Sequence, residues 1–187
     1  SLDSLLDKET ARTYYGKVLH LEHLFNEYLQ GRLYPFTMNK QNYQELFMNL
    51  LERIITNDLL KAGFLQPDEI MNLRKLLKFV GNSMVEGISY SSISANTGIT
   101  KYKAEKYVAL LEKSFILNQV FPKGSNVLKE PKILMSLPYR LLYKKFDDCI
   151  GALREDFFVE IMRFHSKEFF YLKSTRGEKI PDYIVND

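Results

Sequence analysis

Cysteine and histidine are scarce in this chain. The 187 residues include one cysteine, Cys149, and three histidines. A single cysteine excludes an internal disulfide and is typical of a reducing compartment, so we predict a cytoplasmic protein in which Cys149 is a small buried apolar residue. His20 and His23 lie three residues apart beside Glu22 and Glu27. Because no cysteine or third histidine joins them, we predict ordinary surface histidines rather than a metal site.

Long apolar runs are also missing. No run approaches the roughly 18 residues that a membrane-spanning helix needs, and residues 1–12 are too acidic for a signal peptide. We therefore predict no membrane partner. The chain starts with Ser1 and stops directly after a predicted strand at 180–185. A helix and a two-stranded hairpin bury little core by themselves, so we expect the chain to be a piece of a longer protein.

The phosphate-binding loop of nucleotide-binding proteins is absent from the sequence. No G-x-x-x-x-G-K-[ST] motif occurs, and the one Gly-Lys pair, Gly16-Lys17, follows a tyrosine pair rather than a strand and a glycine-rich loop. His165 has no serine or cysteine nucleophile pattern near it. These absences predict a non-catalytic chain with no cofactor of its own.

The positive charge is unevenly distributed. The net charge is +3, but residues 67–146 carry 13 Lys and Arg against 6 Asp and Glu, so this part has a charge of +7 and the rest has −4. Such a basic segment is typical of a module that meets phosphates, although a lysine-rich solvated surface has the same composition.

The basic segment contains the pattern of a winged helix-turn-helix. Ser91 is predicted to cap a short helix that ends at Gly98, since glycine adopts the left-handed conformation there without strain. Thr100 is then predicted to cap a second helix over residues 101–115. Apolar residues recur at helical spacing along it and predict one buried face: Ala104, Tyr107, Val108 and Leu111.

The predicted wing follows this second helix. Residues 116–121 and 132–135 are rich in β-forming residues, and residues 122–126 have the composition of a turn. We predict that DNA contacts come from the outward face of the second helix and from the wing, at Lys101, Tyr102, Lys103, Lys106 and Lys123. The alternative is a protein-interaction or oligomerisation module, in which the lysines are merely solvated and exposed aromatic residues of the first two helices bind a partner.

The remaining pattern completes a mainly α (α+β) fold with three parts. Residues 1–66 are predicted to be a helical lid, with one helix over 5–30 that stops at Gly31 and a second that is capped by Asn39 and ends near Gly63. Residues 67–146 form the winged helix-turn-helix, which opens with a helix from Pro67 to Val80.

Residues 147–187 form the third part. A helix is predicted over 152–164, then strands over 168–173 and 180–185 with a turn at 174–177 between them.

Six short motifs in this order resemble the part that follows the nucleotide-binding core in a family of prokaryotic AAA-type ATPases. The motifs are 27–31 (EYLQG), 51–58 (LERIITND), 89–98 (SYSSISANTG), 151–160 (GALREDFFVE), 171–173 (YLK) and 181–182 (PD). The resemblance covers nearly the whole chain. It implies a helical lid, a winged helix and the start of a C-terminal domain similar to the PD-(D/E)xK restriction-endonuclease fold.

The resemblance also implies a partner and a third candidate function. The longer protein is expected to hold ATP and Mg²⁺ in an ATPase core, which this chain would contact, and to form a possible homo-oligomer. Glu155 and Asp182 match the first two acidic positions of the nuclease motif, where two carboxylates can hold Mg²⁺. The later acidic residue and lysine of that motif would lie after Asp187. Part of a metal-dependent nuclease is therefore the second alternative.

Overall fold

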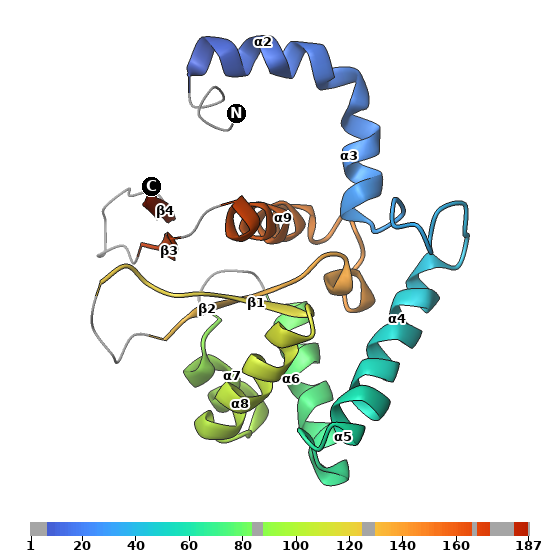
Figure 1. Cartoon of the computed structure of the whole chain (residues 1–187), viewed down its shortest axis with the longest axis vertical. Coiled ribbons are helices and arrows are strands. Elements are labelled where there is room, and N and C mark those ends of the chain that lie inside the picture. The colour runs from blue at the N-terminus through green and yellow to red at the C-terminus, as the bar shows by residue number, and fades with distance from the viewer. Residues whose placement is uncertain (1–6, 84–87, 125–129, 166–167, 173–181, 187) are drawn as a thin grey trace.

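Helices dominate the computed structural model, which describes residues 7–83, 88–124, 130–165, 168–172 and 182–186, and two short antiparallel hairpins complete it (Figure 1). The predicted mainly α (α+β) fold class is confirmed. None of the helices in these ranges is long and apolar enough to cross a membrane. The elements are α2 (Lys8–Val18), η1 (Leu19–Leu21), α3 (Glu22–Leu29), α4 (Tyr43–Arg53), η2 (Ile54–Asp58), α5 (Leu59–Lys61), η3 (Pro67–Glu69), α6 (Ile70–Asn82), α7 (Tyr90–Thr97), α8 (Lys101–Lys113), β1 (Leu117–Val120), β2 (Lys132–Met135), η4 (Tyr139–Leu142), α9 (Ile150–His165), β3 (Glu168–Tyr171) and β4 (Tyr183–Asn186).

The single helix predicted over residues 5–30 is wrong. The short 3-10 turn η1 separates α2 from α3, and the two helices run in clearly different directions (Figure 1). Gly16 and Val18 are weak helix formers and stand just before the break. The predicted stop at Gly31 is confirmed: its φ is +75°, and a Cβ there would lie 2.4 Å from Cγ of Pro138.

The predicted cap of the second helix is also wrong. Asn39 has a left-handed φ of 61° in the preceding loop, and α4 begins after Asn42, whose Nδ2 donates a hydrogen bond to Oε2 of Glu45 (3.3 Å). The helix then continues through the π-helical turn η2 into α5. Thr56 Oγ1 donates to the carbonyl of Glu52 (2.7 Å) within this turn, a contact that is known to bend helices. The helix ends at Gly63 (φ +72°), as predicted.

The helix-turn-helix is present as α7, a tight turn and α8. Gly98 has a φ of 74°, and the side chain of Thr100 accepts the backbone N–H of Lys103 (3.3 Å), as predicted. The cap of α7, however, is Ser89 rather than Ser91. Ser89 Oγ accepts the N–H of Ser92, whose own Oγ accepts the N–H of Ser89 (2.7 Å). This reciprocal capping box fixes the start of α7 two residues earlier than the sequence suggested.

The β1–β2 hairpin has a helical layer on each side (Figure 1). It is antiparallel, with Leu117 opposite Met135. Because strand side chains alternate between faces, Ile133 joins the core that includes α6, α7 and α8, whereas Leu134 packs against Val159 of α9. Burial on both faces explains why the last three residues of β2 are all apolar.

The C-terminal hairpin extends this arrangement. β3 pairs with β4 in an antiparallel manner, as predicted. The N–H of Tyr171 donates to the carbonyl of Phe121 (3.0 Å), and the N–H of Lys123 donates to the carbonyl of Tyr171 (3.1 Å), so β3 lies along the end of β1. The predicted turn at 174–177 and residues 125–126 of the predicted wing turn lie outside the described residues.

Contacts cross both predicted domain boundaries. Phe47 of α4 shares the main apolar core with Leu73 of α6, across residue 66. Val159 of α9 packs on the hairpin, across residue 147. The division into three parts remains a prediction, and the contacts show that neighbouring parts share buried surface.

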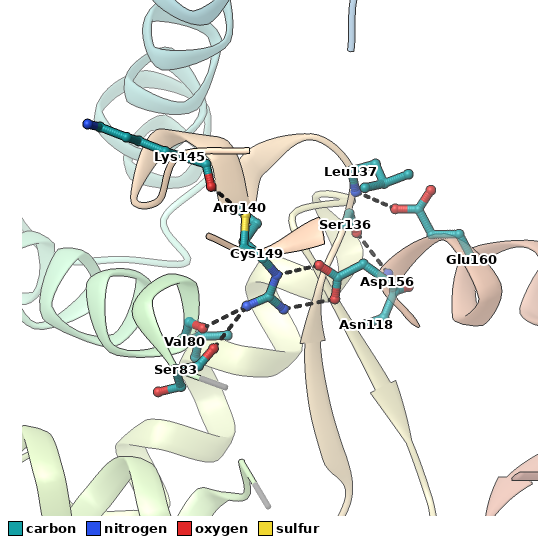
Figure 2. Close-up of polar contacts among 10 residues, drawn as sticks. All are labelled: Val80, Ser83, Asn118, Ser136, Leu137, Arg140, Lys145, Cys149, Asp156 and Glu160. Carbon is teal, nitrogen blue, oxygen red and sulfur yellow. Dashed lines mark hydrogen bonds and ion pairs between the residues drawn. The ribbon is translucent and has the colours of Figure 1, made fainter. Parts of the chain in front are cut away.

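A buried ion pair joins the winged unit to α9, and the sequence did not suggest it. The Arg140 side chain is fully buried. Its Nε and Nη2 donate to the two carboxylate oxygens of Asp156 (2.6 and 2.9 Å), while Nη1 donates to the carbonyls of Val80 (3.4 Å) and Ser83 (3.3 Å) at the end of α6 (Figure 2). One guanidinium thus links three elements.

We expect Arg140→Met to lower the free energy of unfolding by about 3–5 kcal/mol, because the Asp156 carboxylate would stay buried without a counter-charge. The measurement is urea unfolding followed by circular dichroism. The matched control is Arg74→Met, which removes an ion pair to Glu52 whose side chains are 43% and 39% exposed and should cost about 0–1 kcal/mol. Equal effects of the two substitutions would contradict the role of Arg140.

Candidate nucleic-acid interface

α8 presents one face to the core and the other to solvent, as predicted. Ala104, Tyr107, Val108 and Leu111 are all fully buried. On the opposite face Lys101 and Lys106 are exposed, Lys103 is half-buried, and the Tyr102 side chain is 79% exposed. The four residues predicted to contact DNA on this helix therefore lie within its first two turns.

The three α8 lysines that were predicted to contact DNA form ion pairs inside the fold, which the sequence did not predict. Lys101 Nζ pairs with Glu130, which precedes β2. Lys103 and Lys106 both pair with Glu69, at 3.5 and 3.1 Å. The two carboxylates are far from α8 in sequence, so only the fold brings them to it. This face is basic in sequence but largely charge-balanced in structure.

Glu69 links the start of α6 to α8. Its Oε2 accepts the N–H of Gln66 (3.1 Å), which closes a capping box, and its Oε1 accepts the Tyr107 hydroxyl (2.9 Å). Burial acts to raise the pKa of Glu69, but the hydrogen bonds from Gln66, Tyr107 and Lys106 outweigh it and hold the pKa at about 2.

Glu130 has a similar role and links the segment before β2 to α7 and α8. Its carboxylate accepts both the N–H (2.9 Å) and the hydroxyl (2.6 Å) of Ser91 in α7 and also pairs with Lys101. Burial acts to raise the pKa of Glu130, and the contacts with Lys101 and Ser91 lower it to about 2. Ser91, predicted to be a helix cap, instead ties α7 to this carboxylate.

Lys123, the predicted wing contact, lies where the first hairpin meets β3. Lys123 is exposed, and its backbone N–H donates to the carbonyl of Tyr171. This hydrogen bond fixes the backbone of Lys123 beside β3.

The nuclease-like candidates, Glu155 and Asp182, do not form an open metal site in this structure. Glu155 Oε1 accepts both Lys132 Nζ (2.6 Å) and the Tyr183 hydroxyl, so an ammonium already neutralises the carboxylate that Mg²⁺ would need. Burial and the nearby Glu155 raise the pKa of Tyr183. Asp182 is exposed just before β4. The arrangement of Glu155 therefore does not fit a magnesium ligand.

The histidine pair also has no metal-site geometry. His23 Nδ1 lies 3.1 Å from the carbonyl oxygen of His20, and both residues are exposed. Among the residues that the structure describes, no group of three or more His, Cys, Asp and Glu side chains is placed to hold an ion. Cys149 is buried, as predicted, and its Sγ donates to the carbonyl of Lys145 (3.1 Å).

Comparison with known proteins identifies a family but no activity. A family model described as Domain of unknown function (DUF8612) matches residues 22–136, which is more than half of the chain. An uncharacterized protein of Methanocaldococcus jannaschii is 30% identical over 157 residues, which cover 76% of this chain and 33% of that protein. The chain thus spans about a third of the length of this curated relative. No solved structure matches.

We expect acid to destabilise the fold through Glu69 and Glu130. Their pKa in the fold is about 2 against an ordinary 4.5, so the unfolded chain binds protons more readily. Their stabilisation is complete above about pH 4.5 and is lost as the pH falls towards about 2. Urea unfolding at a series of pH values in this range measures the effect.

Glu69→Gln and Glu130→Gln should each reduce the acid-dependent loss. Glu105→Gln is the control, because Glu105 is an exposed carboxylate on α8, the helix that both glutamates contact. A loss that is unchanged in both test variants would show that other groups control acid unfolding.

Proposed function

We propose that this chain, which belongs to the family described as Domain of unknown function (DUF8612), binds duplex DNA through its winged helix. The observation that carries the proposal is the first turn of α8. This turn follows the helix-turn-helix bend at Gly98 and presents Lys101 and Tyr102 to solvent, with Tyr102 79% exposed. A helix that enters the major groove with its N-terminal residues is the common docking mode of this motif.

The ion pairs of the lysines are compatible with phosphate binding. The side chains of Lys101, Lys103 and Lys106 are 55%, 43% and 40% exposed, whereas those of their partners Glu130 and Glu69 are 18% and 8% exposed, so the ammonium groups reach solvent although the carboxylates are largely covered. A phosphate can therefore approach the exposed side of each ammonium group while the carboxylate stays in place. Lys101 is the most exposed of the three, and we assign it the strongest contact.

In this proposal, this chain recognises DNA and another part of a longer protein hydrolyses ATP. That part would be the ATPase core, with ATP and Mg²⁺, in a cytoplasmic protein. The length of the archaeal relative, of which this chain spans about a third, leaves room for such a core.

We expect Lys101→Gln/Lys103→Gln/Lys106→Gln to weaken binding to a labelled random-sequence duplex at least about tenfold in low salt. Each lost phosphate contact should also reduce the slope of log affinity against log salt by about one unit. Fluorescence anisotropy between about 50 and 200 mM salt measures both quantities.

The matched control is Lys61→Gln/Lys75→Gln/Lys78→Gln, which removes the same charge from exposed positions on α5 and α6. Equal weakening by both triple variants would indicate a non-specific charge effect and contradict the assignment to α8. A further single variant, Glu130→Gln, should strengthen binding, since it releases Lys101 from its carboxylate.

A second candidate function is protein interaction through α2, and one observation favours it. None of the residues of α2 is buried, and Figure 1 shows this helix extending beyond the rest of the molecule. An isolated helix of 11 residues is marginal in water. Large apolar side chains are nevertheless exposed along α2 and η1: Tyr14, Tyr15, Val18, Leu19 and Leu21. A partner that covers them would stabilise the helix.

If that partner is a second copy of the chain, Tyr15→Glu/Val18→Glu should abolish self-association at concentrations where the unchanged chain is dimeric. Sedimentation velocity over a concentration series measures this. Glu9→Gln/Lys17→Gln, on the same helix, is the control and should leave the dimer intact. A chain that is monomeric at every concentration would exclude the second copy and leave the ATPase core as the partner of α2.

A further inference from the structure

A cleft at the C-terminal end of α8 has the features of a ligand site. Its volume is about 380 Å³, within the range of about 300–1,000 Å³ that small-molecule sites occupy. Four segments line it: the α3–α4 loop, the end of α8, the β hairpin and α9. The lining residues used below are Tyr34, Glu112, Phe115, Glu160, Arg163 and Phe164.

Phe115 occupies an unfavourable backbone conformation at the mouth of this cleft. Its φ is 57°, in the left-handed region that normally takes glycine at this position after a helix. The N–H of Phe115 donates to the carbonyl of Glu112 (3.0 Å), and the N–H of Ile116 donates to that of Leu111 (2.9 Å). The phenyl ring nevertheless stays 83% exposed. Packing within the chain does not explain an aromatic residue here, and strained positions of this kind cluster at functional sites.

The second exposed aromatic residue of the cleft is Phe164, near the end of α9. Its side chain is 85% exposed. Two exposed rings, one from just after α8 and one from α9, thus line the cleft and offer apolar surface on which a planar or cationic group can lie.

The charges of the cleft leave one carboxylate without a counter-ion. Arg163 Nη1 donates to Glu112 Oε1 (2.7 Å) and to Asn118 Oδ1 (2.9 Å), so the Arg163 and Glu112 charges cancel. Glu160 Oε1 accepts the N–H of Leu137 (2.6 Å). Within the described part of the chain, Oε2 of Glu160 has no hydrogen-bond partner, and Figure 2 shows it pointing away from Leu137.

We propose that this cleft binds a small organic cation, an amidinium, guanidinium or ammonium group on an apolar body. The cationic group would donate to Glu160 Oε2, and the apolar body would lie against Phe115 and Phe164. An anion would meet Glu160 with no available counter-charge, because Arg163 is already paired. A neutral apolar ligand would leave the Glu160 carboxylate without a partner.

The surroundings of Glu160 determine how binding depends on pH. Burial raises the pKa of Glu160 to about 7, the hydrogen bond from Leu137 opposes this, and Asp156 adds to it. Among the described residues, the other titratable or charged groups that face it are Tyr28 and Tyr34, and the paired Arg163 and Glu112 line the same cleft. Since a cation needs the ionised carboxylate, its affinity should fall as the pH drops below about 7.

The test uses benzamidine as the probe and benzamide, which has the same ring without the charge, as the matched control ligand. Isothermal titration calorimetry on the full chain should show benzamidine binding at least about tenfold more tightly than benzamide. The affinity should fall on going from about pH 8 to about pH 6, and heat measured in buffers of different ionisation enthalpy should reveal proton release.

Three variants separate the site from the fold and from DNA binding. Glu160→Gln should reduce benzamidine affinity at least about tenfold. Phe115→Gly should also weaken it while the Tm stays the same or rises, because glycine relieves the left-handed strain. Lys101→Gln/Lys103→Gln/Lys106→Gln should leave it unchanged. Equal binding of benzamide, full affinity in Glu160→Gln, or no saturable binding of benzamidine up to its solubility limit would overturn the proposal.

Discussion

The fully buried guanidinium of Arg140 is the contact on which the arrangement of the C-terminal half depends. It saturates both oxygens of Asp156 in α9 and also meets two carbonyls at the end of α6. Helix ends leave carbonyl groups without intrahelical partners, and a buried carboxylate needs a counter-charge. One side chain answers both requirements, so α6 and α9 can be placed on opposite sides of the β hairpin without an unpaired polar group between them.

A similar use of charge shapes the winged unit. Glu69 and Glu130 fix α8 at two points against the start of α6, α7 and the segment that leads into β2. Their lysine partners are also the groups best exposed for phosphate contact. The same lysine side chains therefore stabilise the fold and form the proposed interface. For this reason, a reduced salt slope is a more specific sign of DNA contact than a loss of stability.

The sequence predicted the elements that local chemistry determines. The predictions were correct for the turn at Gly98, the cap at Thr100 and the buried face of α8, because turn conformation, capping and helical periodicity act over a few residues. The prediction failed where two weak local signals competed. The cap of α4 was assigned to Asn39, but the helix begins after Asn42. Ser91 was misassigned because Ser89 also satisfies a capping pattern, and serines near a helix start are interchangeable in sequence.

The sequence could not predict the contacts that join distant segments. Glu69 meets Lys106 across 37 residues, and Glu130 meets Ser91 across 39. Asp156 was not singled out because nothing in its sequence neighbourhood marks it as buried. For the same reason Glu155 matched a nuclease motif in sequence but bonds Lys132 and Tyr183 in the structure.

The two carboxylate environments at the ends of α8 have opposite consequences for pH. Glu69 accepts charged and neutral donors that favour its ionised form, so acid weakens the fold there. Glu160 has a raised pKa, so the fold prefers its protonated form, and ionisation between about pH 4.5 and 7 removes stability instead. A chain under selection for stability alone has no reason to keep a half-buried carboxylate of this kind beside a strained, exposed phenylalanine. Both features become favourable when a cation lies between them, because it supplies the missing counter-charge and covers the ring. Their coincidence in one cleft is thus stronger evidence for a ligand than either feature by itself.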